Sequence, residues 1–171
     1  MAVLSRSDAK SYLNITGTSH DNELDGFIAA AIAIIESRVG PLEPTEVEAR
    51  VAGTAVVLPV APVLSVTTIA NTGGNVVLDG LDIDLSAGVV SKLGGGTYTV
   101  TYSAGRDPVP ADLVLAVKEL VRHLWQTQRG PTSRPGSAQS DSTSNTVPGA
   151  AYILPFRVEQ LLAPHMQIAV G

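Results

Sequence analysis

The chain has 171 residues, of which 44% are hydrophobic and 4% aromatic, and its formal net charge at pH 7 is −5. This length accommodates one domain with a subdomain and a substantial core, whereas the acidic balance excludes a protein that wraps nucleic acid along its whole surface, because such binding depends on neutralising phosphates. The absence of cysteine excludes disulfides and thiolate metal sites. The longest apolar run, Phe27 to Ile35, is too short for a membrane-spanning helix of about 20 residues.

Residues 1–45 predict two helices. Hydroxyl side chains are the candidate N-caps, Ser5 or Ser7 for the first helix and Thr18 or Ser19 for the second. The first helix ends at Leu13, before the break at Gly17. The second helix has apolar side chains recurring at about 100° per residue and stops at Gly40-Pro41. Its apolar face consists of Leu24, Phe27, Ile28, Ala31, Ile35 and Val39.

Residues 46–103 change to the period of β-strands. The run from Leu81 to Leu85 alternates between apolar and acidic side chains, and Tyr98, Val100 and Tyr102 share one face of a second alternating run. Strands are predicted at 63–69, 76–78, 81–85 and 97–102, with glycine-rich turns between them. The pattern predicts a small antiparallel sheet or sandwich of about four to six strands.

Pro110 opens a third predicted helix, because proline suits the first helical turn. This helix runs to about Arg129. Its apolar stripe consists of Leu113, Ala116, Val117, Leu120, Val121, Leu124 and Trp125. The polar residues 131–150 predict a flexible linker, since they lack the apolar surface that would offset their ordering. Pro155 then starts a short helix that ends near Pro164.

The fold class predicted is therefore α+β. Residues 1–45 and 104–130 form a helical bundle, residues 46–103 an antiparallel β insertion, residues 131–150 the linker, and residues 151–171 an extended C-terminal docking segment. So long a polar stretch is uncommon inside a compact domain, which indicates an assembly protein. The apolar side chains of the docking segment are too many to leave in water, so they either fold back onto the chain's own core or dock on another chain.

Residue types that carry chemistry occur, but their spacing is ordinary. Ser19, His20 and Asp21 are triad types, yet sequence neighbours cannot arrange themselves around one imidazole, so a helix cap is the simpler interpretation. Asp82 and Asp84 share one face of a strand about 7 Å apart. They are either a cation or acid/base pair, or solvated carboxylates of an outer face. We expect no catalytic residue, no cofactor and no metal site.

A basic stripe follows the third helix. Lys118, Arg122 and Arg129 lie near one line on its surface. Such a stripe either faces DNA or an acidic partner, or is a solvated face that complements the negative end of the helix dipole. Both interpretations stay open.

Short segments spread over nearly the whole chain carry a resemblance through their order rather than through one diagnostic motif. They are Tyr12-Leu13-Asn14-Ile15 with the Ala/Ile-rich helix up to Val39-Gly40, Leu58–Val66, Val100–Gly105, Val109–Leu113, His123–Gly130, Leu154-Pro155 and Leu161–Pro164. In this order they resemble the head–tail connector (adaptor) proteins of long-tailed, siphovirus-type bacteriophages.

The resemblance implies a structural virion protein of the neck, assembled in the bacterial cytoplasm, and not an enzyme. It implies a homo-oligomeric ring, commonly of twelve copies, between the portal protein and a stopper or tail-terminator protein. DNA would pass through the channel without specific binding, and no membrane is a partner. In the family the C-terminal segment reaches into the portal. By position, the implied portal or ring interface comprises Trp125, Arg129, Tyr152, Phe156, Arg157, Leu161, Leu162 and His165.

Two other classes of function stay open beside the resemblance. One is a host-surface or glycan-binding β module of a phage tail, against which the low aromatic content argues. The other is a small hydrolase that uses Asp82 and Asp84.

Overall fold

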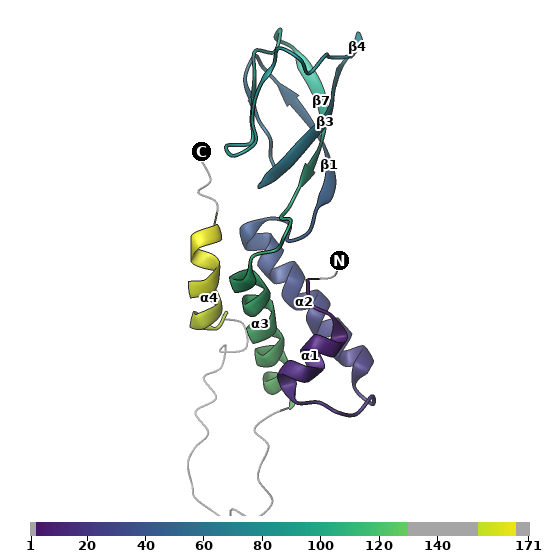
Figure 1. Cartoon of the computed structure of the whole chain (residues 1–171), viewed down its shortest axis with the longest axis vertical. Coiled ribbons are helices and arrows are strands. Elements are labelled where there is room, and N and C mark those ends of the chain that lie inside the picture. The colour runs from purple at the N-terminus through teal and green to yellow at the C-terminus, as the bar shows by residue number, and fades with distance from the viewer. Residues whose placement is uncertain (1–2, 130–153, 167–171) are drawn as a thin grey trace, which may run out of the picture. The chain divides into compact units, whose positions relative to one another are not determined.

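The computed structural model describes residues 3–129 and 154–166 (Figure 1). In the described residues four α-helices accompany two small antiparallel sheets, so the predicted α+β class is confirmed. The chain divides into a β unit, Met1–Val3 with Glu36–Pro110, and a helical unit, Leu4–Ile35 with Ala111–Gly171. The predicted linker at 131–150 and Tyr152 lie outside the described residues, and the domain bounds predicted from the sequence remain a proposal.

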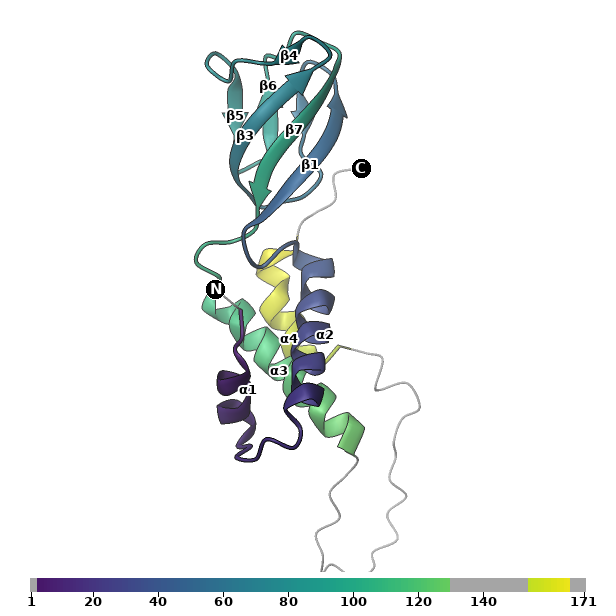
Figure 2. The same ribbon diagram turned by 90° about the vertical axis from the view of Figure 1, so that its right-hand side faces the viewer.

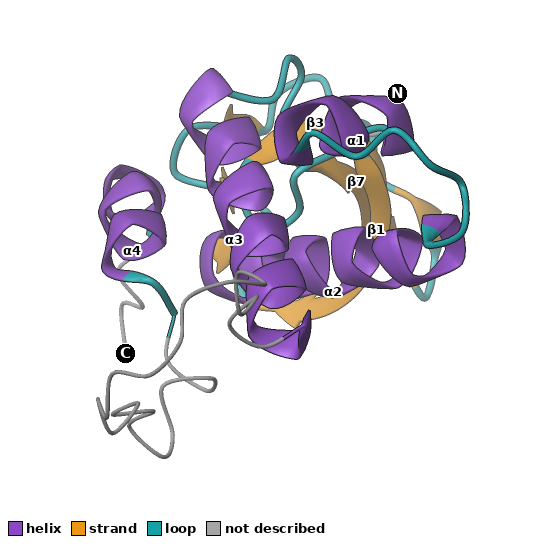
Figure 3. Ribbon diagram, turned by 90° about the horizontal axis from the view of Figure 1, so that it is seen from below, coloured by secondary structure: helices purple, strands orange, loops and turns teal. Residues whose placement is uncertain are grey.

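The helical unit contains α1 (Arg6–Leu13), α3 (Ala111–Arg129), α4 (Phe156–Leu162) and most of α2 (Asp21–Val39). A 3-10 turn, η2 (Ala163–His165), follows α4 directly. Helix α3 lies between α1 and α4 (Figures 1 and 3). The predicted helices are confirmed, and the apolar stripes of α2 and α3 form their buried faces. No helix in the described ranges is long and apolar enough to cross a membrane.

Helix α1 shows how local sequence sets a helix end. The Ser5 hydroxyl accepts a hydrogen bond of 3.1 Å from the backbone N–H of Asp8, so Ser5 is the N-cap of the two serines considered. At the other end Asn14 takes a left-handed conformation with φ of 57°, which stops the helix. The serine cap and the asparagine stop together fix a helix of eight residues.

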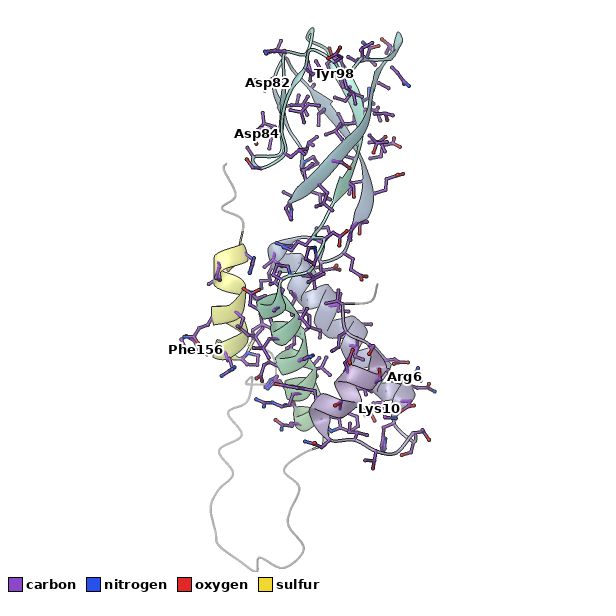
Figure 4. The ribbon with its side chains drawn as sticks, in the orientation of Figure 1. Arg6, Lys10, Asp82, Asp84, Tyr98 and Phe156 are labelled. Atoms are coloured by element: carbon purple, nitrogen blue, oxygen red, sulfur yellow. The ribbon has the colours of Figure 1, made fainter. Side chains whose placement is uncertain are left out.

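Two basic side chains attach α1 to the start of α2. The Arg6 guanidinium forks onto the carboxylate of Asp25, and Lys10 Nζ lies 2.7 Å from Oδ1 of Asp21. The hydrogen bond from Arg6 lowers the pKa of Asp25. Arg6 and Lys10 are both marked on α1 in Figure 4. These pairs hold α1 against the start of α2.

The β unit has seven strands in the part of the chain described. They are β1 (Thr45–Ala52), β2 (Val56–Val57), β3 (Val63–Asn71), β4 (Gly74–Asn75), β5 (Asp82–Asp84), β6 (Val89–Ser91) and β7 (Thr97–Ala104). One sheet has the order β1-β7-β3-β4 and the other the order β2-β6-β5, all antiparallel (Figure 2). In the first sheet Thr45 pairs with Ala104 and Ala52 with Thr97, so β1 and β7 match along their full length.

Alternation along β7 builds the core of the β unit. Tyr98, Val100 and Tyr102 are buried as predicted, and they join a cluster to which both sheets contribute. The Tyr102 hydroxyl accepts a hydrogen bond of 3.0 Å from the backbone N–H of Val60. Burial raises the pKa of Tyr102. The same hydrogen bond holds the loop before β3 against the sheet.

Two strand predictions are corrected by the structure. Residues 76–78 are not a strand; β4 instead comprises Gly74 and Asn75, close to a tight turn. Strand β1 was not predicted, although Val47, Ala49 and Val51 point inward in strict alternation. Its charged outer positions and its alanines have low β propensity, and the pairing with β7 overrides that preference. The short strands β2 and β6 were not predicted either, so the described residues contain seven strands rather than four to six.

The chain leaves α2 through a tightly bonded loop of the β unit. The Arg106 guanidinium donates to the carbonyls of Val39 and Pro41, each at 2.9 Å, and the Glu36 carboxylate accepts from the N–H of Leu42 at 3.0 Å. A cation is favoured at this end of a helix because the last carbonyls have no partner within the helix. Arg106 therefore acts as a side-chain cap for α2.

Candidate functional site

Helix α4 is amphipathic, and its two faces have different surroundings. Val158 and Leu162 are 0% and 1% exposed, whereas Phe156 is 72% exposed. Residues two and six positions after Phe156 lie on the opposite side of a helix, so Phe156 is on the outer face (Figure 4). Leu161 is half-buried and Met166, after η2, is 51% exposed. The docking segment therefore both folds back on its own chain and leaves apolar side chains in solvent.

The fixed backbone angle of Pro155 sets the start of α4. Pro155 has φ of −56° and its carbonyl accepts from the N–H groups of Val158 and Glu159. Proline presets this dihedral angle. Burial of the Val158 and Leu162 side chains contributes about 1.5–3 kcal/mol of stabilising free energy each. This burial stabilises the packing of α4 on α3.

A buried carboxylate joins three helices at this place. Glu119 of α3 is buried, and its Oε2 lies 2.7 Å from Nη2 of Arg122 while Oε1 lies 3.4 Å from Nε of Arg157 on α4. The Tyr12 side chain of α1 also hydrogen-bonds Glu119; burial first, and then this bond, raises the pKa of Tyr12. Two guanidinium groups and a hydroxyl thus compensate one buried charge.

A hydrogen bond between a histidine and a carboxylate lies at the other end of the segment. Nε2 of His165 in η2 is 2.6 Å from Oδ2 of Asp112, in the first turn of α3. This hydrogen bond, followed by that from the backbone N–H of Leu113, lowers the pKa of Asp112. The C-terminal segment is therefore held to α3 at both ends, through Arg157 and through His165.

Trp125, another predicted interface residue, packs within the helical unit. Its ring meets His20 edge-on at 5.8 Å between centroids and Phe27 at 6.2 Å. Such edge-to-face pairs add about 0.5–1.5 kcal/mol beyond area burial. Phe27 lies on α2 and His20 directly before it, so these contacts join α3 to the start of α2. A role of Trp125 in an interface stays a prediction.

The basic stripe of α3 is partly engaged inside the helical unit. Arg122 is paired with Glu119, and Lys118 Nζ lies 6.0 Å from the centroid of the Tyr12 ring, at the limit of a cation–π contact. Arg129 ends α3. These contacts leave less positive charge for a nucleic acid or an acidic partner than the sequence suggests, and the function of the stripe stays a prediction.

The carboxylates of the β unit do not form a reaction centre. Asp82 and Asp84 are exposed at the two ends of β5 (Figure 4). Asp84 accepts from the hydroxyl of Ser86 at 2.6 Å and from two backbone N–H groups of the following turn; the bond from Ser86 is the main cause of its lowered pKa. Within the described residues no group of three His, Cys, Asp or Glu side chains is placed to hold a metal ion.

The structure brings five predicted residues together on one short segment: Phe156, Arg157, Leu161, Leu162 and His165. Sequence reasoning missed their anchors, Glu119, Asp112 and Tyr12. A signal existed for Glu119, which stands directly before Leu120 in the apolar stripe of α3. A carboxylate beside a buried stripe needs a cationic partner, but the sequence does not say which of the arginines supplies it.

The helical unit of this α+β chain thus holds α4 to α3 and exposes an aromatic ring, an arrangement that suits a structural assembly protein. The sequence matches the family of head completion proteins over residues 2–168, and the chain belongs to this family. It is accordingly a structural protein of the head completion family, and not an enzyme. The resemblance to head–tail connectors is confirmed.

Comparison with solved structures supports the fold. The chain is similar to a chain described as "Neck of empty GTA particle computed with C6 symmetry", with a TM-score of 0.65 and 22% sequence identity. The match covers 99% of this chain and 92% of that chain. No curated protein sequence matches the chain significantly.

Proposed function

We propose that the chain forms a ring between the portal protein and the next protein of the neck, a stopper or tail terminator, with DNA passing through its centre. Membership of the head completion family supports this place in the particle. The sixfold symmetry named for the similar GTA neck is compatible with the twelve copies that the resemblance implies, because twelve is a multiple of six.

The observation that carries the portal contact is the outward ring of Phe156. A side chain of this size that is 72% exposed on a helix held at both ends to α3 is a ready anchor for an apolar pocket. The neighbouring Arg157 side chain is 66% exposed and contributes a cation at the edge of the same surface. We therefore assign the portal contact to the outer face of α4.

The charge of the chain supports passage of DNA rather than its capture. The net charge of −5 repels phosphates, and two of the basic side chains of α3 are engaged within the helical unit, Arg122 with Glu119 and Lys118 over the Tyr12 ring. The acidic balance of such a ring disfavours tight binding of phosphates, so DNA slides without specific binding.

The portal contact is tested with Phe156→Ala and, as a matched control, Gln160→Ala on the same exposed side of α4. Loss of a central aromatic anchor costs about 2 kcal/mol or more in binding, so Phe156→Ala is expected to weaken affinity for the portal oligomer at least about thirtyfold. Gln160→Ala is expected to leave the affinity unchanged. Equal affinity of all three proteins for the portal contradicts the assignment.

No observation favours the glycan-binding alternative. Sugar-binding faces use exposed aromatic rings, and both tyrosines of β7, Tyr98 and Tyr102, are buried. Membership of a structural family removes the hydrolase.

A further inference from the structure

Helix α4 depends on α3 for its shape. It has seven residues, and isolated helices shorter than about 12 residues are marginal in water. Its inward side chains, Val158 and Leu162, are buried. We infer that α4 is helical because these side chains pack on α3. A partner that recognises Phe156 on a helical surface therefore recognises α4 and α3 together.

Glu119 connects this pairing of α3 and α4 with the rest of the helical unit. Its carboxylate is buried and contacts Arg122 on its own helix, Arg157 on α4 and Tyr12 on α1. A buried carboxylate strongly favours the arrangement in which its cations are present. Through Arg157, this preference selects one register of α4 on α3, and that register turns Phe156 outward.

We propose that the partner binds α4 while α4 stays on α3, and that Glu119 is the positioning residue for this surface. The existence of the partner rests on the proposed function. The partner surface is an apolar pocket for the Phe156 ring with an acidic group at its rim, because the Arg157 side chain is 66% exposed although it pairs with Glu119. The opposite mechanism, in which α4 leaves α3 and enters the partner as a free segment, is the outcome that overturns the proposal.

The first test compares Glu119→Gln with Asp25→Asn in the full chain, by hydrogen–deuterium exchange and by affinity for the portal oligomer. Asp25→Asn removes an ion pair between α1 and α2 that does not involve α4, so it controls for general loss of stability. Glu119→Gln is expected to accelerate exchange of the amides of Val158–Leu162 and to weaken portal affinity about tenfold. Asp25→Asn is expected to change neither.

A double-mutant cycle separates positioning from a merely structural effect. If Glu119 acts by presenting Phe156, then Glu119→Gln has less effect on affinity in a Phe156→Ala background than in the wild type. Full additivity of the two substitutions overturns the positioning role. Unchanged α4 exchange in Glu119→Gln also overturns it.

Hydrogen–deuterium exchange in the complex with the portal shows whether α4 stays packed on α3. Undiminished protection of α3 and α4 amides on portal binding supports the proposal, whereas faster exchange along the α3 face that α4 covers overturns it. A wild-type chain that does not bind the portal contradicts the proposed function instead, and α4 exchange in the free protein then still decides the role of Glu119.

Discussion

At the scale of single residues, Gly40 shows how one backbone position constrains the chain. Its φ is +81°, and a Cβ added there would run into the carbonyl oxygen of Ala61. Only glycine adopts this conformation without strain and permits so close an approach of two backbone segments. The glycine that the sequence marks as a helix stop is therefore also a packing requirement between the end of α2 and the loop before β3.

Gly40→Ala is consequently expected to destabilise the protein by about 3–4 kcal/mol, since it adds both strain and a clash with backbone. The control is Gly26→Ala, in α2, where an added Cβ meets nothing within 4 Å. Helix propensity makes that change stabilising by about 0.5–1 kcal/mol. Chemical denaturation of the three proteins measures both, and a loss at Gly40 no larger than 1 kcal/mol would show that the loop adapts.

Asp112 is the residue whose environment predicts a pH effect. The hydrogen bond with His165 lowers its pKa in the folded chain. A lowered carboxyl pKa contributes stability that is present above the unfolded value of about 3.9 and is lost as pH falls through the folded-state pKa. Asp112 thus contributes to the acid limb of the stability profile.

Asp112→Asn is expected to lower the melting temperature at about pH 5, and the difference from the wild type is expected to shrink as the pH falls below the unfolded pKa of about 3.9. Thermal melts across this range measure the convergence. The control Asp79→Asn replaces an exposed aspartate in a turn of the β unit. A constant gap between wild type and Asp112→Asn over the whole range contradicts the assigned linkage.

At the scale of elements, the two faces of the seven-residue helix α4 have different functions. Its inner face attaches the segment to α3 and its outer face carries the exposed ring of Phe156. The sequence left two destinations open for the apolar tail, its own core or another chain. The described part of the structure seats Val158 and Leu162 on the chain itself, while the docking of Phe156 on a partner remains our proposal.

Leu162→Ala tests the inner face. Truncation of a fully buried leucine removes its packing and leaves a cavity, so the expected loss of stability is about 2–5 kcal/mol, unless α4 detaches, in which case the loss is limited to the free energy of its docking. The two cases differ in hydrogen exchange, because detachment abolishes protection of α4 and leaves the rest of the helical unit protected. Gln160→Ala, on the outer side, is the control and is expected to leave both quantities unchanged.

At the scale of the whole molecule, the two units carry different features. The helical unit carries the predicted portal surface, and the β unit carries two sheets that both contribute buried side chains to one core. In a closed ring each copy must also present complementary faces to its two neighbours.

At this scale the prediction concerns the assembly of the phage particle. An early stop codon in the gene is expected to leave DNA-filled heads beside free, finished tails in electron micrographs of the lysate, because a connector joins the two after packaging. Expression of the wild-type chain from a plasmid serves as the control and is expected to restore complete particles. Normal virions without the protein would exclude the connector function.

Much of the secondary structure followed from the sequence because its causes are local. The Ser5 cap, the stop at Gly40 and the alternation of Tyr98, Val100 and Tyr102 act within a few residues of themselves. Strand β1 escaped prediction because its alanines and charged side chains disfavour strands locally, and only pairing with β7, some fifty residues away by register, stabilises it.

The sequence by itself determined the α+β class, most of the helix bounds, the family resemblance and the segment that carries the candidate site. Only the tertiary structure decided which face of α4 is outward and which carboxylates hold it. Glu119 and Arg157 are 38 residues apart, as the numbering shows, and Asp112 and His165 are separated by 53. Pairings over such separations depend on how helices pack, and no local pattern encodes them.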